Sequence, residues 1–465
     1  MSEAVAIYST LSKQKEPVTP GPEGVVRIYA CGPTVYGRVH IGNARPYIVF
    51  SVLKRFLERR GMRTLFVSNL TDVNDKIYVA AREQGISSSE LAENCSEAYV
   101  EDTDRLGLGR PDLEPRVTES MPEIIDVIQT LVDKGLAYAA GGDVYFRVDR
   151  FARYGALSGR DLDEMVSNEP GEGKENPLDF ALWKGRKPDE DTWWESPWGD
   201  GRPGWHIECS AMSVTALGRD FEIHGGGLDL AFPHHENEIA QSEGATDERM
   251  AQIWMHNEML ELSGDKMSKS VGNIALLHEV LDEWPAEVVL AYFLRAHYRS
   301  KLPFSDAHLA DAAEVCERIR NGARAIDRAM GSPGEATNPQ LARALVAARR
   351  DFYAALDDDF GTPGAFAALF DLIRAINQAV EGDRPTAGQL QEVRRELVEM
   401  LDVFGLAGLA KGEGAVPAEV IDLLAEREAA RDARDFERAD VARDQILELG
   451  FELRDTPEGP QVYPR

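Results

Sequence analysis

The fold is decided by the stretch Val25-Val26-Arg27-Ile28-Tyr29-Ala30-Cys31-Gly32-Pro33. Its first six residues form the apolar run expected of a buried strand, and the Cys-Gly-Pro that follows indicates a turn. Residues 44–60 then carry apolar side chains at helical spacing, and residues 64–69 have the composition of a second strand. Strand, helix and strand in this order predict a parallel α/β unit.

Outward from this unit, the chain changes character several times. The change in sequence pattern from 111 to 204 indicates an insertion, which includes a hairpin strand at 141–148. Strand patterns resume at 221–224 and 253–256. Beyond 306 the pattern is helical, in particular at 341–356 and 363–380, and 451–463 could form a small hairpin. We therefore expect a parallel-sheet α/β domain with an insertion, then a helical bundle and a small C-terminal domain. The six segments predicted are 1–110, 111–204, 205–262, 263–305, 306–406 and 418–465.

Length and composition are those of a soluble multidomain protein. The 465 residues exceed what one core supports, and 43% apolar with 28% charged residues is ordinary globular usage. No apolar run approaches the roughly 20 residues that span a bilayer, so we expect a cytoplasmic protein without a membrane partner. Four cysteines are too few for a disulfide scaffold. The net charge of -29 argues against non-specific binding to nucleic acid, so any RNA contact must be local.

One cluster has the chemistry of a metal site. In Phe232-Pro233-His234-His235-Glu236-Asn237-Glu238, His234 and Glu238 are four residues apart and would share a helix face. Zinc takes about four ligands from cysteine, histidine and carboxylate, and Cys209 and Cys31 could complete such a set. Paired histidines near a helix start are more often capped or hydrogen-bonded, so spacing alone leaves that alternative open.

Two further stretches could bind phosphates. Lys266 and Lys269 lie among small residues in Ser263-Gly264-Asp265-Lys266-Met267-Ser268-Lys269-Ser270, and ammonium groups suit the charge that grows on a leaving pyrophosphate. The stretch can equally be a solvated surface loop. His40, Gly42 and Asn43 lie between the first strand and a helix start, where backbone N–H groups favour anions.

The common nucleotide motifs are not present. The sequence has no Gly-x-x-x-x-Gly-Lys-Ser/Thr loop, and Gly225-Gly226-Gly227 continues as Leu228-Asp229-Leu230 without the third glycine of the dinucleotide fingerprint. A nucleotide site at the C-terminal edge of a parallel sheet remains.

Taken together, His40-Ile41-Gly42-Asn43 and Lys266-Met267-Ser268-Lys269-Ser270 resemble the two signatures of class I aminoacyl-tRNA synthetases, in the right order and far apart. Three further stretches are similar to the cysteine-specific branch of that family: Cys31-Gly32-Pro33-Thr34-Val35-Tyr36, Gly204-Trp205-His206-Ile207-Glu208-Cys209 and His224-Gly225-Gly226-Gly227-Leu228-Asp229. The resemblance extends from about Tyr8 to the C-terminus.

The resemblance implies a Rossmann-type catalytic domain that joins cysteine to tRNA(Cys) at the expense of ATP with Mg²⁺, in a monomer. It implies one zinc ion held by Cys31, Cys209, His234 and Glu238, which binds the substrate thiolate. Serine and alanine lack a soft sulfur, so no editing domain is needed. By the same resemblance His40, Asn43, Lys266 and Lys269 act on the phosphates. Gly42, His224, Gly226 and Asp229 shape the nucleotide pocket, and Thr34 and Trp205 contact substrate.

Two features depart from the family pattern. Asn43 stands where related enzymes often have histidine, which keeps a hydrogen-bond donor, and Asn74 stands where aspartate is expected, so the role of that position is in doubt. Cys95 and Cys316 match no functional position and are expected to be buried or idle thiols in helices.

The C-terminal end has no clear basic surface. Arg427, Arg431, Arg434 and Arg438 would share one helix face, as an RNA-contacting ridge or as a salt-bridged solvated helix, because acidic residues surround them. The resemblance assigns this end to anticodon recognition and the preceding bundle to the tRNA stem.

Two rival functions remain. One is a ligase that delivers cysteine to the amine of a small sugar-like acceptor, which would not need the long C-terminal extension. The other is a non-catalytic RNA-binding relative, which would be expected to have lost a motif.

Overall fold

The computed structural model describes residues 4–161, 173–262, 275–410, 418–432, 435–449, 451–456 and 459–464. Its centre is a four-stranded sheet in the order β10-β9-β3-β4, in which every neighbouring pair is parallel. The strands are β3 (Val25–Ala30), β4 (Arg63–Ser68), β9 (Phe221–Gly227) and β10 (Ala251–Asn257). The predicted parallel α/β unit is therefore confirmed, and β9 and β10 join it from far along the chain.

Helix α1 (Ile41–Arg59) connects β3 to β4. It begins where the His40 side chain caps it by accepting a hydrogen bond from the Gly42 N–H. Its buried face, which includes Ile48, Leu53 and Phe56, packs into the main hydrophobic core. Burying one such side chain contributes roughly 1.5–3 kcal/mol, so this face holds the helix in place.

The segment after β4 carries α2 (Asp75–Gln84) and α3 (Ser88–Asp104). Asn74 is the N-cap of α2, and its side chain accepts a hydrogen bond from the Lys76 N–H at 3.1 Å. Asparagine and aspartate cap helices about equally well, so the capping function of this position does not depend on the expected aspartate.

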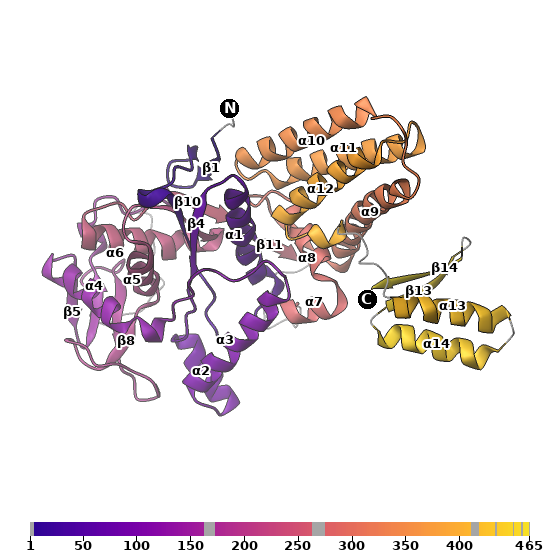
Figure 1. The fold of residues 1–465 in the computed structure, drawn as a ribbon. Helices are drawn as coiled ribbons and strands as arrows, with labels where there is room; N and C mark the ends of the chain where they lie inside the picture. The colour runs from indigo at the N-terminus through magenta and orange to yellow at the C-terminus, as the bar shows by residue number, and fades with distance from the viewer. Residues whose placement is uncertain are drawn as a thin grey trace.

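The region between β4 and β9 adds a second sheet, on the opposite side of the parallel sheet from the helical bundle (Figure 1). After α4 (Met121–Asp133) come four antiparallel strands, β5 (Ala137–Ala140), β6 (Asp143–Phe146), β7 (Phe180–Gly185) and β8 (Gly201–Pro203). The predicted hairpin is present, and its two turn glycines, Gly141 and Gly142, both have positive φ, as tight hairpin turns require.

Short strands close other parts of the molecule. The antiparallel hairpin of β1 (Ala6–Ser9) and β2 (Gln14–Pro17) precedes the main sheet. The parallel pair β11 (Leu260–Leu262) and β12 (Leu302–Phe304) follows it. In the chain, α5 (Trp205–Leu217) follows β8, and α6 (Glu236–Thr246) lies between β9 and β10. Both helices carry candidate site residues.

The helical half predicted beyond 306 is confirmed. Six helices lie between the main sheet and the C-terminal unit: α7 (Leu277–Glu283), α8 (Ala286–Leu294), α9 (Asp306–Met330), α10 (Pro339–Asp357), α11 (Thr362–Glu381) and α12 (Ala387–Val403). Their core is continuous with that of α1, as shown by the Phe56 and Phe360 rings at 6.0 Å. Among the described residues, no helix combines the length and apolarity needed to cross a bilayer.

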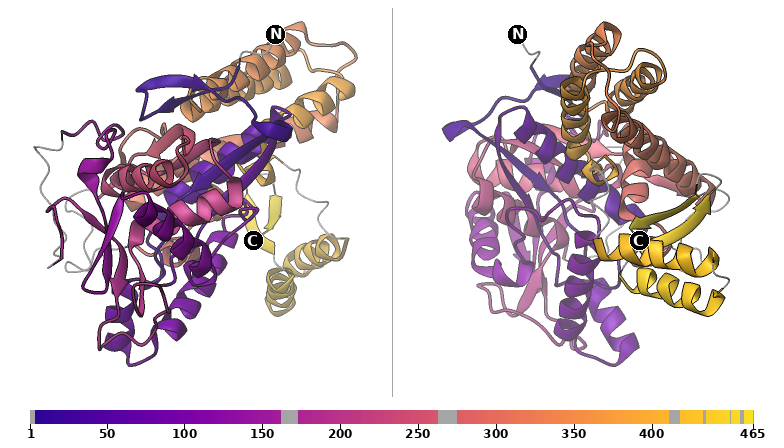
Figure 2. Two further views of the ribbon diagram at one scale, coloured as in Figure 1. Left: turned by 90° about the vertical axis from the view of Figure 1, so that its left-hand side faces the viewer. Right: turned by 45° about the vertical axis from the view of Figure 1, so that its right-hand side comes forward.

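The C-terminal unit lies outside the main body, below the bundle in both views of Figure 2. It consists of α13 (Ala418–Asp432), α14 (Phe436–Glu448) and the predicted hairpin, β13 (Phe451–Thr456) and β14 (Gly459–Pro464).

The prediction that four arginines share one helix face is wrong. Helix α13 ends at Asp432, and Asp435 caps the start of α14 by accepting from the Arg438 N–H, so Arg427 and Arg438 lie on different helices. Arg434 lies outside the described residues. Arg427 pairs with Glu428 and Arg438 with Glu426, each at 2.7 Å, which favours the salt-bridged alternative.

Asp359 ties the N-terminal strand to the helical half. Its buried carboxylate accepts from the Tyr8 N–H at 2.8 Å, the Tyr298 hydroxyl at 2.6 Å and the Arg299 Nε at 2.9 Å. Asp359 also has a φ of 59°, a conformation that asparagine tolerates.

Asp359→Asn is expected to lower the free energy of unfolding by about 2–3 kcal/mol, because hydrogen bonds to a charged group are worth about that much. Urea unfolding measures the change. Asp371→Asn is the control, because Asp371 and Arg374 form an exposed pair whose loss should change stability by less than about 1 kcal/mol. Equal effects of the two substitutions would contradict this role for Asp359.

Candidate active site and metal centre

The four predicted metal ligands come together. Cys31 follows β3, Cys209 lies on α5, His234 in the turn before α6, and Glu238 on α6. One possible ligand atom from each lies within 4.8 Å of all the others, and all four residues are buried. Two thiols, an imidazole and a carboxylate form a donor set that zinc commonly takes.

The surroundings of this cluster favour the ionised forms of Glu238 and Cys209. Burial opposes ionisation of Glu238, but His224 and His234 outweigh it and hold the pKa of the carboxyl well below its usual range. A hydrogen bond from Cys31 lowers the pKa of Cys209 to about 6, although burial raises the pKa of Cys31 itself. An anionic thiolate and a carboxylate in a buried space suit a divalent cation such as zinc.

Three histidines that the sequence analysis did not single out lie around the ligands. His235 contacts the Cys31 sulfur through Nε2 at 3.3 Å and the His256 Nε2 through Nδ1 at 2.8 Å. His206 contacts His234, with their Nδ1 atoms 2.9 Å apart. Hydrogen-bond partners of metal ligands typically orient them, so these histidines are candidates for that role.

His224 and Trp205 contact different residues of the cluster. His224 is fully buried in β9, and its Nε2 is 2.7 Å from Glu238 Oε2. Trp205, at the start of α5, is 36% exposed, and its ring lies 4.3 Å from that of His234. The exposed tryptophan therefore marks the side of the cluster that faces solvent.

A second set of possible ligand atoms is equally close together. Cys31, His224, His235 and Glu238 lie within 4.8 Å of one another, and Cys31 and Glu238 belong to both sets. The two sets differ in whether Cys209 and His234, or His224 and His235, complete the coordination.

The predicted nucleotide-binding residues lie at the C-terminal edge of the sheet. His40 and Asn43 are at the start of α1, where His40 is half-buried and Asn43 is exposed. Gly226 is near the end of β9, and Asp229 is in the exposed turn that follows. This edge is where open parallel sheets bind ligands.

Gly226 connects the two parts of the site. A Cβ at this position would lie 2.9 Å from the Leu230 side chain and 3.4 Å from the His235 ring, so a side chain would not fit without movement. Gly226, a predicted nucleotide-binding residue, therefore lies next to His235, which contacts Cys31.

Thr34 lies in the turn after β3, bridged to Thr71, whose hydroxyl donates to Glu208 at 3.1 Å. Lys266 and Lys269 lie outside the described residues. Cys95 and Cys316 are buried in α3 and α9, as expected.

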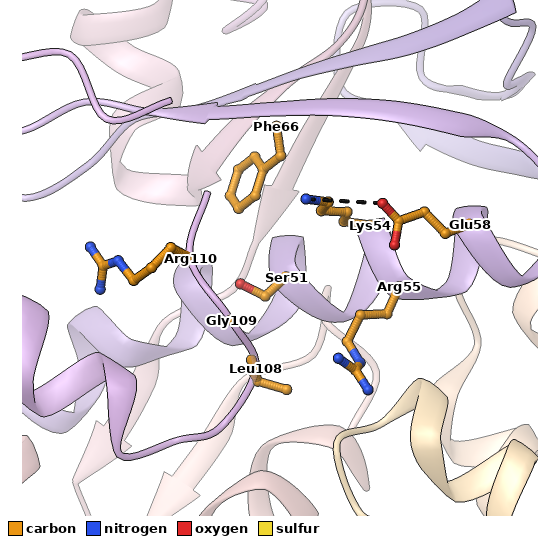
Figure 3. A pocket seen from close by; sticks show the side chains of 8 residues that line it. All are labelled: Ser51, Lys54, Arg55, Glu58, Phe66, Leu108, Gly109 and Arg110. Atoms are coloured by element: carbon orange, nitrogen blue, oxygen red, sulfur yellow. Dashed lines mark ion pairs between the residues drawn. The ribbon is translucent and has the colours of Figure 1, made fainter. Parts of the chain in front are cut away.

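A separate hollow of about 190 Å³ lies at the other end of α1, between Ser51, Phe66 and the segment 108–110 (Figure 3). Its three cations already have carboxylate partners: Lys54 with Asp112, Arg55 with Asp402, and Arg110 with Glu114. The hollow has no surplus positive charge and contains none of the predicted site residues.

Three family models match the chain. The model of the class I (C) tRNA synthetase catalytic domain matches residues 17–314, the DALR domain model 351–408, and the model of the cysteinyl-tRNA ligase anticodon binding domain 413–462.

Proteins named cysteine–tRNA ligase are similar over almost the whole chain. The one from Carboxydothermus hydrogenoformans is 45% identical over 97% of this chain and 98% of its own length. The one from Desulfitobacterium hafniense is 45% identical over 98% of both chains.

Solved structures share the fold at low identity. The Mycobacterium tuberculosis methionyl-tRNA synthetase in complex with methionyl-adenylate has a TM-score of 0.62 at 15% identity, over 86% of this chain and 94% of its own. The LeuRS of a ternary complex from Agrobacterium radiobacter has a TM-score of 0.61 at 14% identity, over 84% of this chain and 86% of its own. The domain models, the full-length identity and the shared fold agree, and the chain belongs to the cysteine–tRNA ligase family of class I aminoacyl-tRNA synthetases.

Proposed function

We propose that the chain activates L-cysteine with ATP and transfers it to the 3′ end of tRNA(Cys), using zinc held by Cys31, Cys209, His234 and Glu238. The observation that carries this proposal is the buried cluster of two thiols, an imidazole and a carboxylate in contact with the nucleotide edge of the sheet. Trp205, which is partly exposed and packs on the His234 ring, is the proposed contact for the amino acid as it enters.

Zinc bound there would offer a coordination position for a soft sulfur ligand, which the cysteine substrate supplies and serine does not. A substrate that lacks this bond is rejected strongly, because the site gains nothing in its place. The protein residues that support this choice are His224, which holds Glu238, and His235, which contacts Cys31.

The reaction has two displacements. A carboxylate oxygen of cysteine attacks the α-phosphorus of ATP, supplied with Mg²⁺, and pyrophosphate leaves. The terminal 2′-hydroxyl of tRNA then attacks the cysteinyl carbonyl and AMP leaves. Catalysis of both steps is mainly positioning and charge stabilisation.

The proposed roles follow this chemistry. His40 and Asn43 hydrogen-bond to phosphate oxygens at the start of α1, where Gly42 allows close approach, and Lys266 and Lys269 neutralise the pyrophosphate. Gly226 and Asp229 shape the adenylate pocket, and Thr34 and Trp205 contact substrate. For His224 the contact with Glu238 supports a role in orienting that ligand as well as in shaping the pocket.

The C-terminal part is proposed to bind tRNA(Cys), with 306–406 on the stem and 418–465 on the anticodon. The segments 1–110 and 205–262 would form the catalytic domain around the insertion 111–204, and 263–305, which contains Lys266 and Lys269, would contact the tRNA stem. We propose that the protein works as a cytoplasmic monomer. A small amine acceptor is not favoured, because the chain matches the model of an anticodon binding domain.

Cysteine-dependent exchange between ATP and pyrophosphate is the direct test. We expect exchange with cysteine, at least about a thousandfold less with serine, and about one zinc ion per chain. Charging of tRNA(Cys), but not of glucosamine or a similar sugar amine, would identify the acceptor. No exchange by zinc-replete protein would refute the enzymatic function and favour a non-catalytic RNA-binding protein.

A further inference from the structure

Arg45 is a fully buried cation in the second turn of α1. Its guanidinium donates to four main-chain carbonyls, those of Glu258 at 2.5 Å, Met259 at 3.2 Å, His297 at 3.2 Å and Ser300 at 2.7 Å. Among the described residues it forms no ion pair, and burial lowers its pKa to about 10, so it stays charged at neutral pH. Burying a charge is costly unless its donors are satisfied, and here backbone oxygens satisfy them.

The four carbonyls belong to two segments that lie side by side. Glu258 and Met259 follow β10 and lead into β11, while the 297–300 turn leads into β12. The Glu258 N–H donates to the Tyr298 carbonyl at 2.8 Å, and β11 pairs with β12. Arg45 therefore fixes this pair of segments against α1, close to the helix start.

The clamped segment lies beside the proposed nucleotide site. A Cβ added to Gly42 would lie 3.9 Å from Leu260 Cδ1, and one added to Gly227 would lie 3.7 Å from the Met259 sulfur. Met259 is 43% exposed, although Arg45 holds its main-chain carbonyl. Leu260 thus lies next to the start of α1 and Met259 next to the end of β9, the two turns proposed to bind the nucleotide.

We propose that Arg45 is a positioning residue for the nucleotide: by holding the carbonyls of Glu258 and Met259, it sets Met259 and Leu260 as one wall of the ATP pocket. The inference rests on the proposed function and adds a specific route by which a buried residue controls ATP binding. If Arg45 had a purely structural role, its substitution would lower stability and would change the affinities for ATP and for cysteine to the same extent.

Arg45→Lys tests the proposal. A lysine keeps the charge but has no planar fork, so it cannot hold carbonyls on both segments in the same geometry. We expect the KM for ATP in the exchange reaction to rise about tenfold while the KM for cysteine changes less than about twofold, since displacements of about 1 Å can cost about a hundredfold. Equilibrium binding of ATP to the same proteins should weaken by the same factor.

Arg55→Lys is the matched control. Arg55 lies on the same helix and also donates to a main-chain carbonyl, that of Asp402, at 2.6 and 3.0 Å, but it lies at the separate hollow. It should lower the thermal unfolding temperature without changing either KM. Met259→Ala should raise the KM for ATP on its own, and combined with Arg45→Lys its effect should be less than additive.

An unchanged affinity for ATP in Arg45→Lys, equal changes in both KM values, or additivity with Met259→Ala would overturn the inference. Absence of exchange in the wild-type protein would instead overturn the proposed function, and ATP binding would still decide the role of Arg45.

Discussion

Cys209→Ser is expected to remove most of the bound zinc and to lower cysteine-dependent exchange by more than about a hundredfold, because losing even an outer partner of a metal ligand typically costs 10–100-fold. Cys209 is buried on α5, and its sulfur lies within 4.8 Å of the ligand atoms of Cys31, His234 and Glu238. Serine keeps the size and removes the soft thiolate, so the fold should persist while the metal is lost. Metal analysis of the purified variant and exchange in added zinc measure the two effects.

Cys316→Ser is the matched control. Cys316 is also fully buried in a helix, and its sulfur lies 3.4 Å from the Glu287 carbonyl oxygen, but it is not in either candidate ligand set. It should keep about one zinc per chain and wild-type exchange. Equal zinc content in Cys209→Ser and Cys316→Ser would show that Cys209 is not a ligand.

The local parts of the fold could be predicted because short patterns determine them. The apolar run at Val25–Ala30, the glycine turn at 141–142 and the helical spacing beyond 306 each correspond to an element of the structure. Strands β9 and β10 are predicted as short runs, but the pairing of β9 with β3 and of β10 with β9 depends on contacts between distant segments, which spacing within one run does not encode.

The clustering of the four candidate ligands was predictable in part for a similar reason. His234 and Glu238 share a helix face by local spacing, whereas Cys31 and Cys209 were assigned on ligand chemistry and family resemblance. His256 was missed because its role depends on the register of β10 against β9, which places it opposite Gly226. The alternation of Trp254 and His256 on one strand face, beside His224, was the signal that could have identified it.

The prediction that the four arginines share one helix face was wrong because helical spacing was extended across a helix end. Asp435 caps the start of α14, so the preceding helix must end before it. A capping residue within a charged stretch therefore indicates a helix boundary. The separation of Arg427 from Arg438 follows from that cap.

The adjacent histidines His234 and His235 decide between the two candidate ligand sets. His234 Nε2 lies 3.0 Å from Glu238 Oε1, and its ring packs on the exposed Trp205. Both histidines have contacts at both nitrogens, because His234 also contacts His206 through Nδ1. His235 contacts Cys31 and His256, and His256 continues the chain of contacts to the Thr10 hydroxyl at 2.8 Å. Because His234 packs on the partly exposed Trp205 and His235 contacts His256 instead, we predict that His234 is a zinc ligand and that His235 orients Cys31.

His234→Gln is therefore expected to lose zinc and to lower exchange by more than about a hundredfold, whereas His235→Gln should keep about one zinc per chain at saturating metal, with an affinity lower by about 10–100-fold. Both substitutions remove one buried imidazole and leave an amide of similar reach, so their effects on packing are matched. Zinc titration of the two apoproteins and exchange at saturating zinc measure the difference. The reverse order of zinc affinities would assign the metal to Cys31, His224, His235 and Glu238, and would leave Cys209 and His234 as residues of the substrate side alone.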